Sequence, residues 1–384
     1  MNELELRAIL ELKSIHGLGD VGLRRLLRKH VTAAGALEAI RSDPRAGAAR
    51  RAPQGRIERA LDFFEASGIT VLLESEPRYP ARLRNLKDPP PVLFCAGDVS
   101  LVTMSSVAVV GSRRHTEYGA TATDMVVAGL SRAGVVIVSG LARGIDRIAH
   151  ETALYAGGRT IAVLGCGLDV AYPREHLALQ EAIGRSGLVL SEFLPGEPPV
   201  RHNFPKRNRV LAALAHALVV IEAGPKSGAL ITVDHALDLG LDVFAVPGPI
   251  GRTTSGGTNE LIRDGASLIE SPAPVLEAIF GPRAAGAMGE HPASGVPAPS
   301  GADSRAGGRA AAAPESSSDP VRGALLAVLG PISIHVDDAA RRANVSATDA
   351  LVRLLELELE GEVRQLPGMR FARRGAPIPE SRNA

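Results

Sequence analysis

From Ile69 to about residue 280, short apolar segments alternate with stretches that have the spacing of amphipathic helices. We predict strands at Ile69–Leu73, Val92–Ala96, Val107–Val110, Val135–Val138, Thr160–Leu164, Leu188–Leu190, Ala217–Ile221, Asp242–Val246 and Ser267–Ile269. We predict helices between them, near residues 117–132, 146–156, 174–184, 206–215, 227–239, 258–264 and 273–280. This alternation predicts an α/β fold with a Rossmann-like, mainly parallel sheet and helices on both of its faces.

A helical pattern also precedes this region, over residues 1 to about 66. Within it, Ile15–Leu27 resembles a SAM-like or helix-hairpin-helix element built around the tight turn Gly17-Leu18-Gly19. Such a turn can present backbone N–H groups to a phosphate, or it can simply join two packed helices. The sequence leaves both interpretations open.

The region after the predicted sheet divides into two parts. Residues 281–319 are mainly Ala, Gly, Pro and Ser, a composition that predicts a flexible linker. Helical patterns then return at Val321–Leu329, Val336–Ala343 and Ala347–Leu359, and a hairpin is expected around Gly361–Phe371. This order is typical of a winged helix-turn-helix. The expected domains are therefore 1–66, 67–280 and 320–384, with 281–319 as the linker.

The composition limits the classes of function. The 43 Lys and Arg residues nearly balance the 42 Asp and Glu residues, so the net charge is +1 and any nucleic-acid binding must come from one face. No apolar run approaches the roughly 18 residues that a membrane span needs, and Met1–Glu5 lack the apolar core of a secretory signal. Cys95 and Cys166 are far apart and lack metal-ligand spacing. We therefore expect a cytoplasmic protein without a structural metal.

The densest positive charge lies in the run Arg201–Arg209, whose sequence is Arg-His-Asn-Phe-Pro-Lys-Arg-Asn-Arg. No acidic residue occurs between Glu197 and Glu222, which predicts that nothing nearby neutralises this charge. Guanidinium and ammonium groups match phosphate oxygens, and the ring of Phe204 can stack on a base. The alternative is a solvated basic turn that opens a helix. The position of the run in the fold favours phosphate binding.

Six predicted strands end in loops rich in small and polar residues. Because the carboxyl ends of parallel strands meet at one edge of a sheet, these loops are expected to lie together, and ligands bind at that edge. Glycines allow the backbone to approach a phosphate, and helix N-termini supply free N–H donors. The cations expected to converge there are Arg113, Arg114, Arg143, Lys206, Arg207, Arg209 and Lys226.

A bound nucleotide cofactor is not expected at this edge. After Gly165 and Gly167, the position of the third glycine in a dinucleotide fingerprint is occupied by Val170. The segment Gly224–Gly228 is too short for a phosphate-binding loop of the Walker A type. An open, elongated edge that accepts a polynucleotide backbone remains the favoured interpretation.

Catalytic interpretations are weaker. Asp146 and His150 are four residues apart on one helix face and could form an acid/base pair or two metal ligands. The favoured alternative is that Asp146 caps the helix start while His150 packs against the sheet. Glu222 has no obvious nucleophile partner, so we expect its carboxylate to orient a loop. Ser139, Ser191 and Ser227 lie at strand ends, but none has a nucleophile-elbow sequence.

These loops resemble the DNA-processing protein A (DprA/Smf) family. The resemblance rests on Gly111-Ser112-Arg113, Ser139-Gly140-Leu141-Ala142-Arg143-Gly144-Ile145-Asp146, Phe204-Pro205-Lys206-Arg207-Asn208-Arg209, Ser227-Gly228-Ala229-Leu230-Ile231-Thr232 and Pro247-Gly248, and it covers about residues 70–270. It implies a cytoplasmic protein, dimeric through its α/β domain, that binds and protects incoming single-stranded DNA and loads RecA recombinase onto it during natural transformation. From the residues themselves, we expect no cofactor, no metal and no membrane partner.

Carried onto this sequence, the resemblance implies that the Gly-Ser-Arg loop and the basic run line the DNA pocket. Together with the other strand-end loops, the predicted DNA-binding residues are Ser112, Arg113, Ser139, Gly140, Arg143, Gly144, Arg201, Phe204, Lys206, Arg207, Asn208, Arg209, Ser227 and Gly228. Only 3% of the residues are aromatic, so backbone charge is expected to dominate binding, with strong salt dependence.

The predicted recognition helix of the winged helix differs in charge from helices that bind duplex DNA. Ser346–Leu359 carries Asp349, Glu356 and Glu358 against the single cation Arg353. A major-groove helix needs cations and amides, so we expect a protein-contact role there. A transcription factor that uses this winged helix is the remaining alternative.

The main alternative to single-strand binding is an enzyme, ahead of the transcription factor. Gly256-Gly257-Thr258-Asn259-Glu260 partly resembles the signature of lysine-decarboxylase-like nucleotide phosphoribohydrolases, which release a free base from nucleoside monophosphates. In that signature the Glu lies three residues after the Thr, whereas Glu260 lies two residues after Thr258. The offset turns the carboxylate away from the expected helix face. We therefore predict a non-catalytic single-strand binder.

Overall fold

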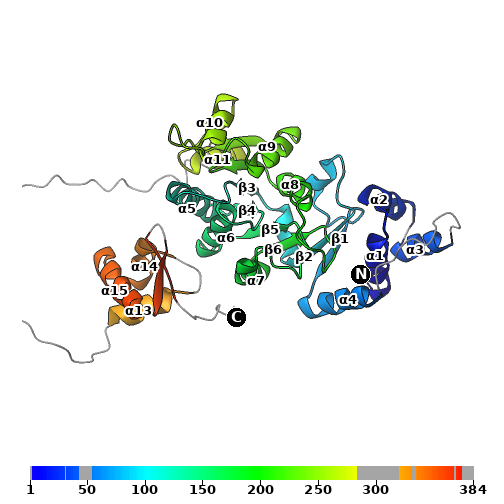
Figure 1. The fold of residues 1–384 in the computed structure, drawn as a ribbon, viewed down its shortest axis with the longest axis horizontal. Coiled ribbons are helices and arrows are strands. Elements are labelled where there is room, and N and C mark those ends of the chain that lie inside the picture. Colours follow the sequence, from blue (N-terminus) through cyan, green and yellow to red (C-terminus); the bar gives the residue numbers. More distant parts are fainter. Residues whose placement is uncertain are drawn as a thin grey trace, which may run out of the picture. The chain divides into compact units, whose positions relative to one another are not determined.

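The computed structural model describes residues 2–30, 32–42, 54–282, 320–330, 334–366 and 369–373. The chain forms two compact units, residues 1–282 and 283–384, which are considered separately (Figure 1). Residues 283–319, nearly all of the predicted linker, lie outside the described residues.

The first unit is built on a nine-stranded sheet with the order β1-β2-β6-β5-β4-β3-β7-β8-β9. All nine predicted strands are present, with ends that differ by at most one residue. They are β1 (Thr70–Leu73), β2 (Val92–Gly97), β3 (Ser106–Val110), β4 (Val136–Ser139), β5 (Thr160–Leu164), β6 (Leu188–Ser191), β7 (Ala217–Val220), β8 (Asp242–Ala245) and β9 (Ser267–Leu268). The neighbours from β6 to β9 pair in parallel, and only β1 and β2 run antiparallel to their partners.

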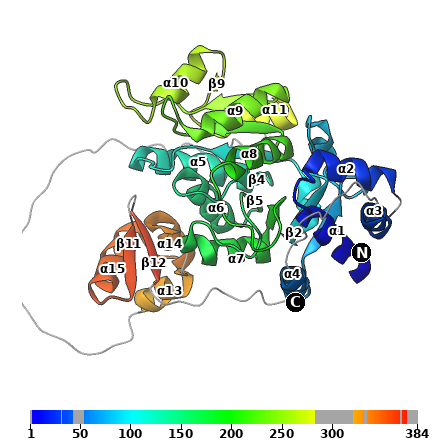
Figure 2. The same cartoon turned by 45° about the vertical axis from the view of Figure 1, so that its right-hand side comes forward.

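Helices cover both faces of this sheet, as predicted (Figures 1 and 2). They are α5 (Glu117–Arg132), α6 (Ile145–Tyr155), α7 (Leu177–Ser186), α8 (Asn203–Leu214), α9 (Gly228–Asp238), α10 (Gly256–Arg263) and α11 (Ala273–Phe280). Strand β3 shows why: Ala108 and Val110 pack with α8 and α9, whereas Val107 and Val109 pack with α5, α6 and α11. Side chains of a strand alternate between faces, so an apolar strand needs a helix on each side.

Four helices precede the sheet in the chain: α1 (Glu3–Ser14), α2 (Asp20–Lys29), α3 (Ala33–Arg41) and α4 (Gln54–Ser67). They share a hydrophobic cluster with β1 and β2, in which the rings of Phe64 and Phe94 lie 5.3 Å apart. The predicted glycine turn separates α1 from α2, and Gly17 has a φ of +85° that favours glycine. Contact of this turn with DNA stays a prediction.

The second unit is a winged helix, as predicted. Helices α13 (Pro320–Val328), α14 (Val336–Ala343) and α15 (Ala347–Leu359) pack with a sheet of order β10-β12-β11. Its strands are β10 (Ile334–His335), β11 (Val363–Leu366) and β12 (Arg370–Arg373). Strand β10 was not predicted, because two residues are too short for a period-two pattern. Glu356 pairs with Arg353 and Glu360 with Arg322, so the acidity of α15 is partly balanced within this unit.

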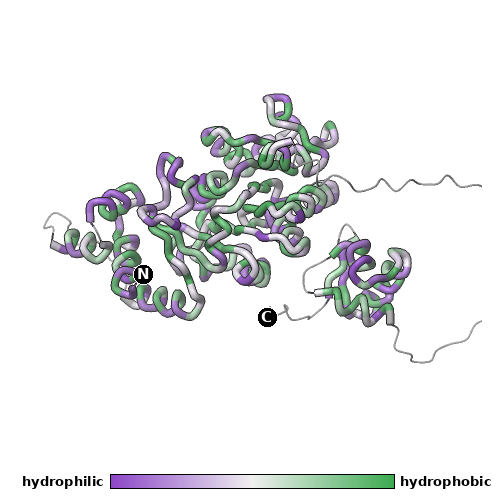
Figure 3. Tube along the Cα trace, turned by 180° about the vertical axis from the view of Figure 1, so that it is seen from behind, coloured by the Kyte–Doolittle hydropathy of each residue, from purple (hydrophilic) through white to green (hydrophobic). Residues whose placement is uncertain are grey.

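In the tube coloured by hydropathy, the segments in the middle of the sheet are mainly apolar (Figure 3). Among the described residues, no helix is long and apolar enough to cross a membrane. Polar side chains line a pocket where the parallel strands end. Strands β3, β4, β5, β6, β7 and β8 are mutually parallel, so the six loops that follow them share one edge, as expected from the sequence.

Candidate nucleic-acid interface

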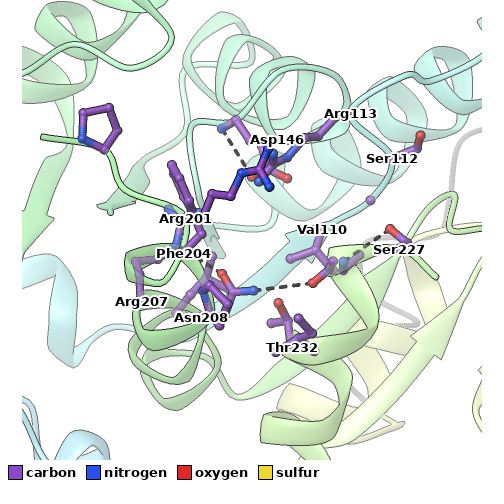
Figure 4. A pocket seen from close by; sticks show the side chains of 18 of the residues that line it. Val110, Ser112, Arg113, Asp146, Arg201, Phe204, Arg207, Asn208, Ser227 and Thr232 are labelled. Atoms are coloured by element: carbon purple, nitrogen blue, oxygen red, sulfur yellow. Dashed lines mark hydrogen bonds between the residues drawn. The ribbon is translucent and has the colours of Figure 1, made fainter. Parts of the chain in front are cut away.

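A cavity of about 820 Å³ lies at the carboxyl ends of the central strands and is called the strand-end pocket. Its walls come from the end of β3 and the loop after it, the start of α6, the segment before α8, α8 itself and the first turns of α9 (Figure 4). Eight predicted site residues line it: Ser112, Arg113, Arg201, Phe204, Arg207, Asn208, Ser227 and Gly228. These eight of the fourteen predicted residues therefore lie together in the structure, and their contact with DNA stays a prediction.

Several lining residues were not among the predicted DNA-binding set. They include Arg114, Asp146, Tyr172, Leu211, Ile231 and Thr232. Arg114 was among the cations expected at this edge, and Tyr172 could have been found from its place in the loop after β5. Thr232 follows from helix periodicity, because it lies one turn after Gly228 at the N-terminus of α9.

Helix α8 supplies the largest part of the wall. It begins at Asn203, about three residues earlier than predicted, because Pro205 lies in the first turn, where its missing N–H needs no partner. Phe204, Asn208 and Leu211 follow each other at helical spacing and line the pocket. Asn208 also donates from its side-chain nitrogen to the carbonyl oxygen of Gly228 at 3.5 Å, which links α8 to the start of α9 (Figure 4).

An aromatic and cationic cluster lies at one side of the pocket. The Arg113 guanidinium carbon lies 5.5 Å from the centre of the Phe204 ring, and the Tyr172 ring lies 5.4 Å from the same ring. Arg113, Arg114 and Arg201 are exposed, whereas Phe204 is half-buried. Exposed guanidinium groups beside a ring provide both phosphate contacts and a stacking surface.

Arg207 has a different position from the other cations of the basic run. It is only 4% exposed, and its guanidinium donates to the carbonyl oxygens of Gly140, at 2.7 Å, and Val163. A Cβ atom on Gly140 would lie 2.5 Å from the guanidinium, so the contact requires glycine there. Arg207 therefore fastens α8 to the ends of β4 and β5, and its charge faces the interior.

Asp146 lies buried beside Arg207 at the floor of the pocket and accepts a hydrogen bond from the backbone N–H of Ala142 at 3.3 Å. Burial raises the pKa of this carboxyl, and the nearby charge of Arg207 opposes the rise. Burial also lowers the pKa of Arg207, and Asp146 opposes that shift. The two groups thus compensate each other, and Asp146 belongs to the scaffold. Gly144, and not Asp146, is the N-cap of α6.

Lys206 and Arg209 lie on the other side of α8 and do not line the strand-end pocket. Lys206 lies 2.5 Å from the carboxylate of Asp20 and 3.3 Å from that of Glu192, and Arg209 lies 2.6 Å from Glu192. The expectation that nothing neutralises the basic run was therefore wrong for these two residues. Asp20 is 186 positions away from Lys206 in the sequence, so a search along the chain could not find it.

The remaining four predicted site residues support the pocket without lining it. The Ser139 hydroxyl is buried and donates to the carbonyl oxygen of Val109 at 2.6 Å. Gly140 receives Arg207, and Gly144 has a φ of +83° and lies against the backbone of Ser112 and Arg113. Arg143 is exposed and pairs with exposed Glu175 at 2.6 Å. Ser139, Gly140 and Gly144 are buried and set the shape of the loops, whereas Arg143 is exposed.

The scaffold interpretations of His150 and Glu222 are confirmed. His150 is fully buried, its Nδ1 lies 2.7 Å from the Thr160 hydroxyl, and burial lowers its pKa to about 3. Glu222 accepts hydrogen bonds from the backbone N–H and the hydroxyl of Thr116, at 2.8 and 2.6 Å, and so orients the loop before α5. Glu260 is exposed on α10 and is not part of the pocket wall.

Comparison with known proteins gives consistent matches. A family model described as DNA recombination-mediator protein A matches residues 70–280, and one described as the DprA winged helix domain matches residues 309–369. The DNA processing protein DprA of Streptococcus pneumoniae is 48% identical over 198 residues, which are 52% of this chain and 70% of the relative. Protein Smf of Escherichia coli is 37% identical over 318 residues, 82% of this chain and 80% of the relative.

Two solved structures have similar folds. That of DNA processing protein A from Streptococcus pneumoniae has a TM-score of 0.61 and 36% identity, and the match covers 72% of this chain and 97% of that one. That of DNA processing protein A from Helicobacter pylori, described by its single-stranded DNA binding mode, has a TM-score of 0.50 and 35% identity, with 54% of this chain and 94% of that one covered.

Arg207 is buried and Arg113 is exposed, so replacing each of them should change the stability of the protein by different amounts. Replacing Arg207 with Ala removes the largest favourable charge near the buried Asp146 carboxylate and two buried hydrogen bonds, so we expect a loss of about 3 kcal/mol or more in the free energy of unfolding. Arg113→Ala removes an exposed side chain and should cost less than about 1 kcal/mol. Urea denaturation of the two variants measures both values, and equal losses would contradict the assignment of Arg207 to the scaffold.

Proposed function

Because this chain belongs to the DNA recombination-mediator protein A family, we propose that its strand-end pocket binds single-stranded DNA. The observation that carries the proposal is the gathering of exposed Arg113 and Arg201 around the half-buried ring of Phe204. This combination of cations and a stacking surface suits an unpaired strand, which offers phosphates and free base faces together.

In the proposed complex, the guanidinium groups of Arg113, Arg114 and Arg201 bind successive phosphates. The N-terminus of α9, capped by Ser227, contributes the positive end of its dipole. A base stacks on Phe204, and Tyr172 extends the aromatic surface. Since phosphate contacts dominate, binding should depend strongly on salt and little on sequence.

The fourteen predicted site residues divide into two groups under this proposal. Those that line the pocket contact the DNA, with Arg207 holding the wall in place. Ser139, Gly140 and Gly144 shape the loops. Arg143 forms an ion pair with Glu175, and Lys206 and Arg209 form ion pairs behind α8. The second group therefore affects DNA binding indirectly.

We further propose that the chain acts as a homodimer through its α/β domain, protects incoming DNA in the cytoplasm and loads RecA recombinase onto it during natural transformation. The family description as a recombination mediator supports this role. No feature of the pocket calls for a hydrolytic step, and the displaced position of Glu260 on α10 gives the phosphoribohydrolase alternative no support.

The DNA proposal predicts the salt dependence of binding. Each phosphate contact to a single strand contributes about 0.7 to the slope of log K against log salt, so Arg113→Ala with Arg201→Ala should flatten the slope by roughly 1.4 and weaken binding at low salt. Fluorescence anisotropy with an oligothymidylate at several salt concentrations measures this. Arg185→Ala is the matched control, since Arg185 is exposed at the end of α7, at the opposite edge of the sheet. A slope unchanged in the double variant would refute the pocket assignment.

The recombinase proposal has its own test. With oligonucleotide coated by a single-strand binding protein, the wild-type chain should shorten the lag before RecA filaments form, and the Arg113→Ala, Arg201→Ala variant should not. RecA ATP hydrolysis stimulated by DNA reports filament formation. Tight DNA binding without any shortening of the lag would leave the protein as a single-strand binder and exclude the loading role.

A further inference from the structure

A cluster of five charged groups joins α8 to the N-terminal helices. Asp20, the first residue of α2, places one carboxylate oxygen 3.1 Å from the Lys13 ammonium and the other 2.5 Å from the Lys206 ammonium. On the far side, Glu192 lies 3.3 Å from Lys206 and 2.6 Å from Arg209. Lys206 thus lies between two carboxylates that belong to distant parts of the chain.

Asp20 occupies a place that favours an anion. It begins α2 directly after the Gly17-Leu18-Gly19 turn, and the N-cap residue Gly19 offers no side chain to satisfy the first backbone N–H groups. Two lysine ammonium groups face the same point. These charges lower the pKa of Asp20 to about 2 in spite of its burial, so the carboxylate is charged at neutral pH.

The charges of the cluster do not cancel completely. Three cations face two carboxylates, which leaves a net charge of +1. Glu192 is only 2% exposed and is shared between Lys206 and Arg209, so it cannot neutralise both. Asp20 therefore neutralises the part of the Lys206 charge that Glu192 leaves.

Lys206 is nevertheless close to the strand-end pocket. Its chain neighbours Pro205 and Arg207 line the pocket, and 38% of its own side chain is exposed. A lysine side chain is long and flexible, and its ammonium group binds a phosphate as a point charge. Its ion pairs with Asp20 and Glu192 hold it away from the pocket, and of these two carboxylates Glu192 is shared with Arg209.

We propose that the Asp20 carboxylate competes with DNA phosphate for the Lys206 ammonium and so sets the affinity of the basic helix for single-stranded DNA. The inference rests on the proposed function of the strand-end pocket. It assigns the N-terminal helices a regulatory contact: they attenuate binding through one side chain that does not touch the DNA.

The consequence of removing this carboxylate can be calculated. Asp20→Asn keeps the shape of the side chain but raises the net charge of the cluster from +1 to +2. Lys206 then becomes available for one additional phosphate, which steepens the slope of log K against log salt by about 0.7. At low salt the affinity should rise by about two- to fivefold, because one partly exposed ion pair changes an equilibrium constant by about that factor.

The experiment is a titration of fluorescent oligothymidylate with the full chain at several salt concentrations. Asp20→Asn should bind more tightly with the steeper slope, and Asp20→Glu, which keeps the charge, should resemble the wild type. Asp62→Asn is the matched control, because it removes the same charge from an exposed position on α4. Wild-type affinity and slope in a folded Asp20→Asn variant would overturn the inference.

Lys206→Met provides a second, independent test that leaves Asp20 paired with Lys13 and Glu192 paired with Arg209. Because Lys206 is compensated in the wild type, this change alone should leave the salt slope nearly unaltered, and it should abolish the gain of Asp20→Asn in the double variant. A slope flattened by about 0.7 in Lys206→Met, or a gain that persists in the double variant, would overturn the inference. Absence of any oligonucleotide binding by the wild type would instead remove the proposed function itself, and this inference with it.

Discussion

The contact between the Arg207 guanidinium and the carbonyl oxygens of Gly140 and Val163 holds the candidate site together. It connects α8 to the ends of β4 and β5, and it is possible only because Gly140 has no side chain. One terminal nitrogen of the guanidinium donates to both carbonyl groups. Asp146 compensates the buried charge. The arrangement keeps the basic helix at the edge of the sheet where the other strand-end loops gather.

From this fixed position, α8 presents different chemistry on its two sides. Phe204, Asn208 and Leu211 line the strand-end pocket together with Arg201 and the Gly-Ser-Arg loop. Lys206 and Arg209 form ion pairs behind it with Glu192 and Asp20. One short basic sequence therefore provides pocket-lining side chains, the buried Arg207 contact and ion pairs to the N-terminal helices, and these different positions follow from helical spacing.

Much of the fold and part of the candidate site could be predicted from the sequence, because they depend on residues that are close together along the chain. The alternation of Val107 and Val109 with Ala108 and Val110 defines a strand covered on both faces, and parallel strands bring Arg113, Arg201 and Ser227 to one edge. The loop-orienting role of Glu222 followed from its lack of a nucleophile partner. The ion pair of Lys206 with Asp20 and the burial of Arg207 could not be predicted, because they depend on residues brought close only by tertiary packing.

We propose that exposed guanidinium groups bind the DNA while Arg207 remains bound to the sheet. The decisive measurement is a structure of the full chain with a short oligothymidylate. We expect phosphates beside Arg113 and Arg201, a base against Phe204, and Arg207 still bonded to Gly140 and Val163. A strand that follows the opposite edge of the sheet, or an Arg207 that has left these carbonyl groups to bind a phosphate, would contradict it.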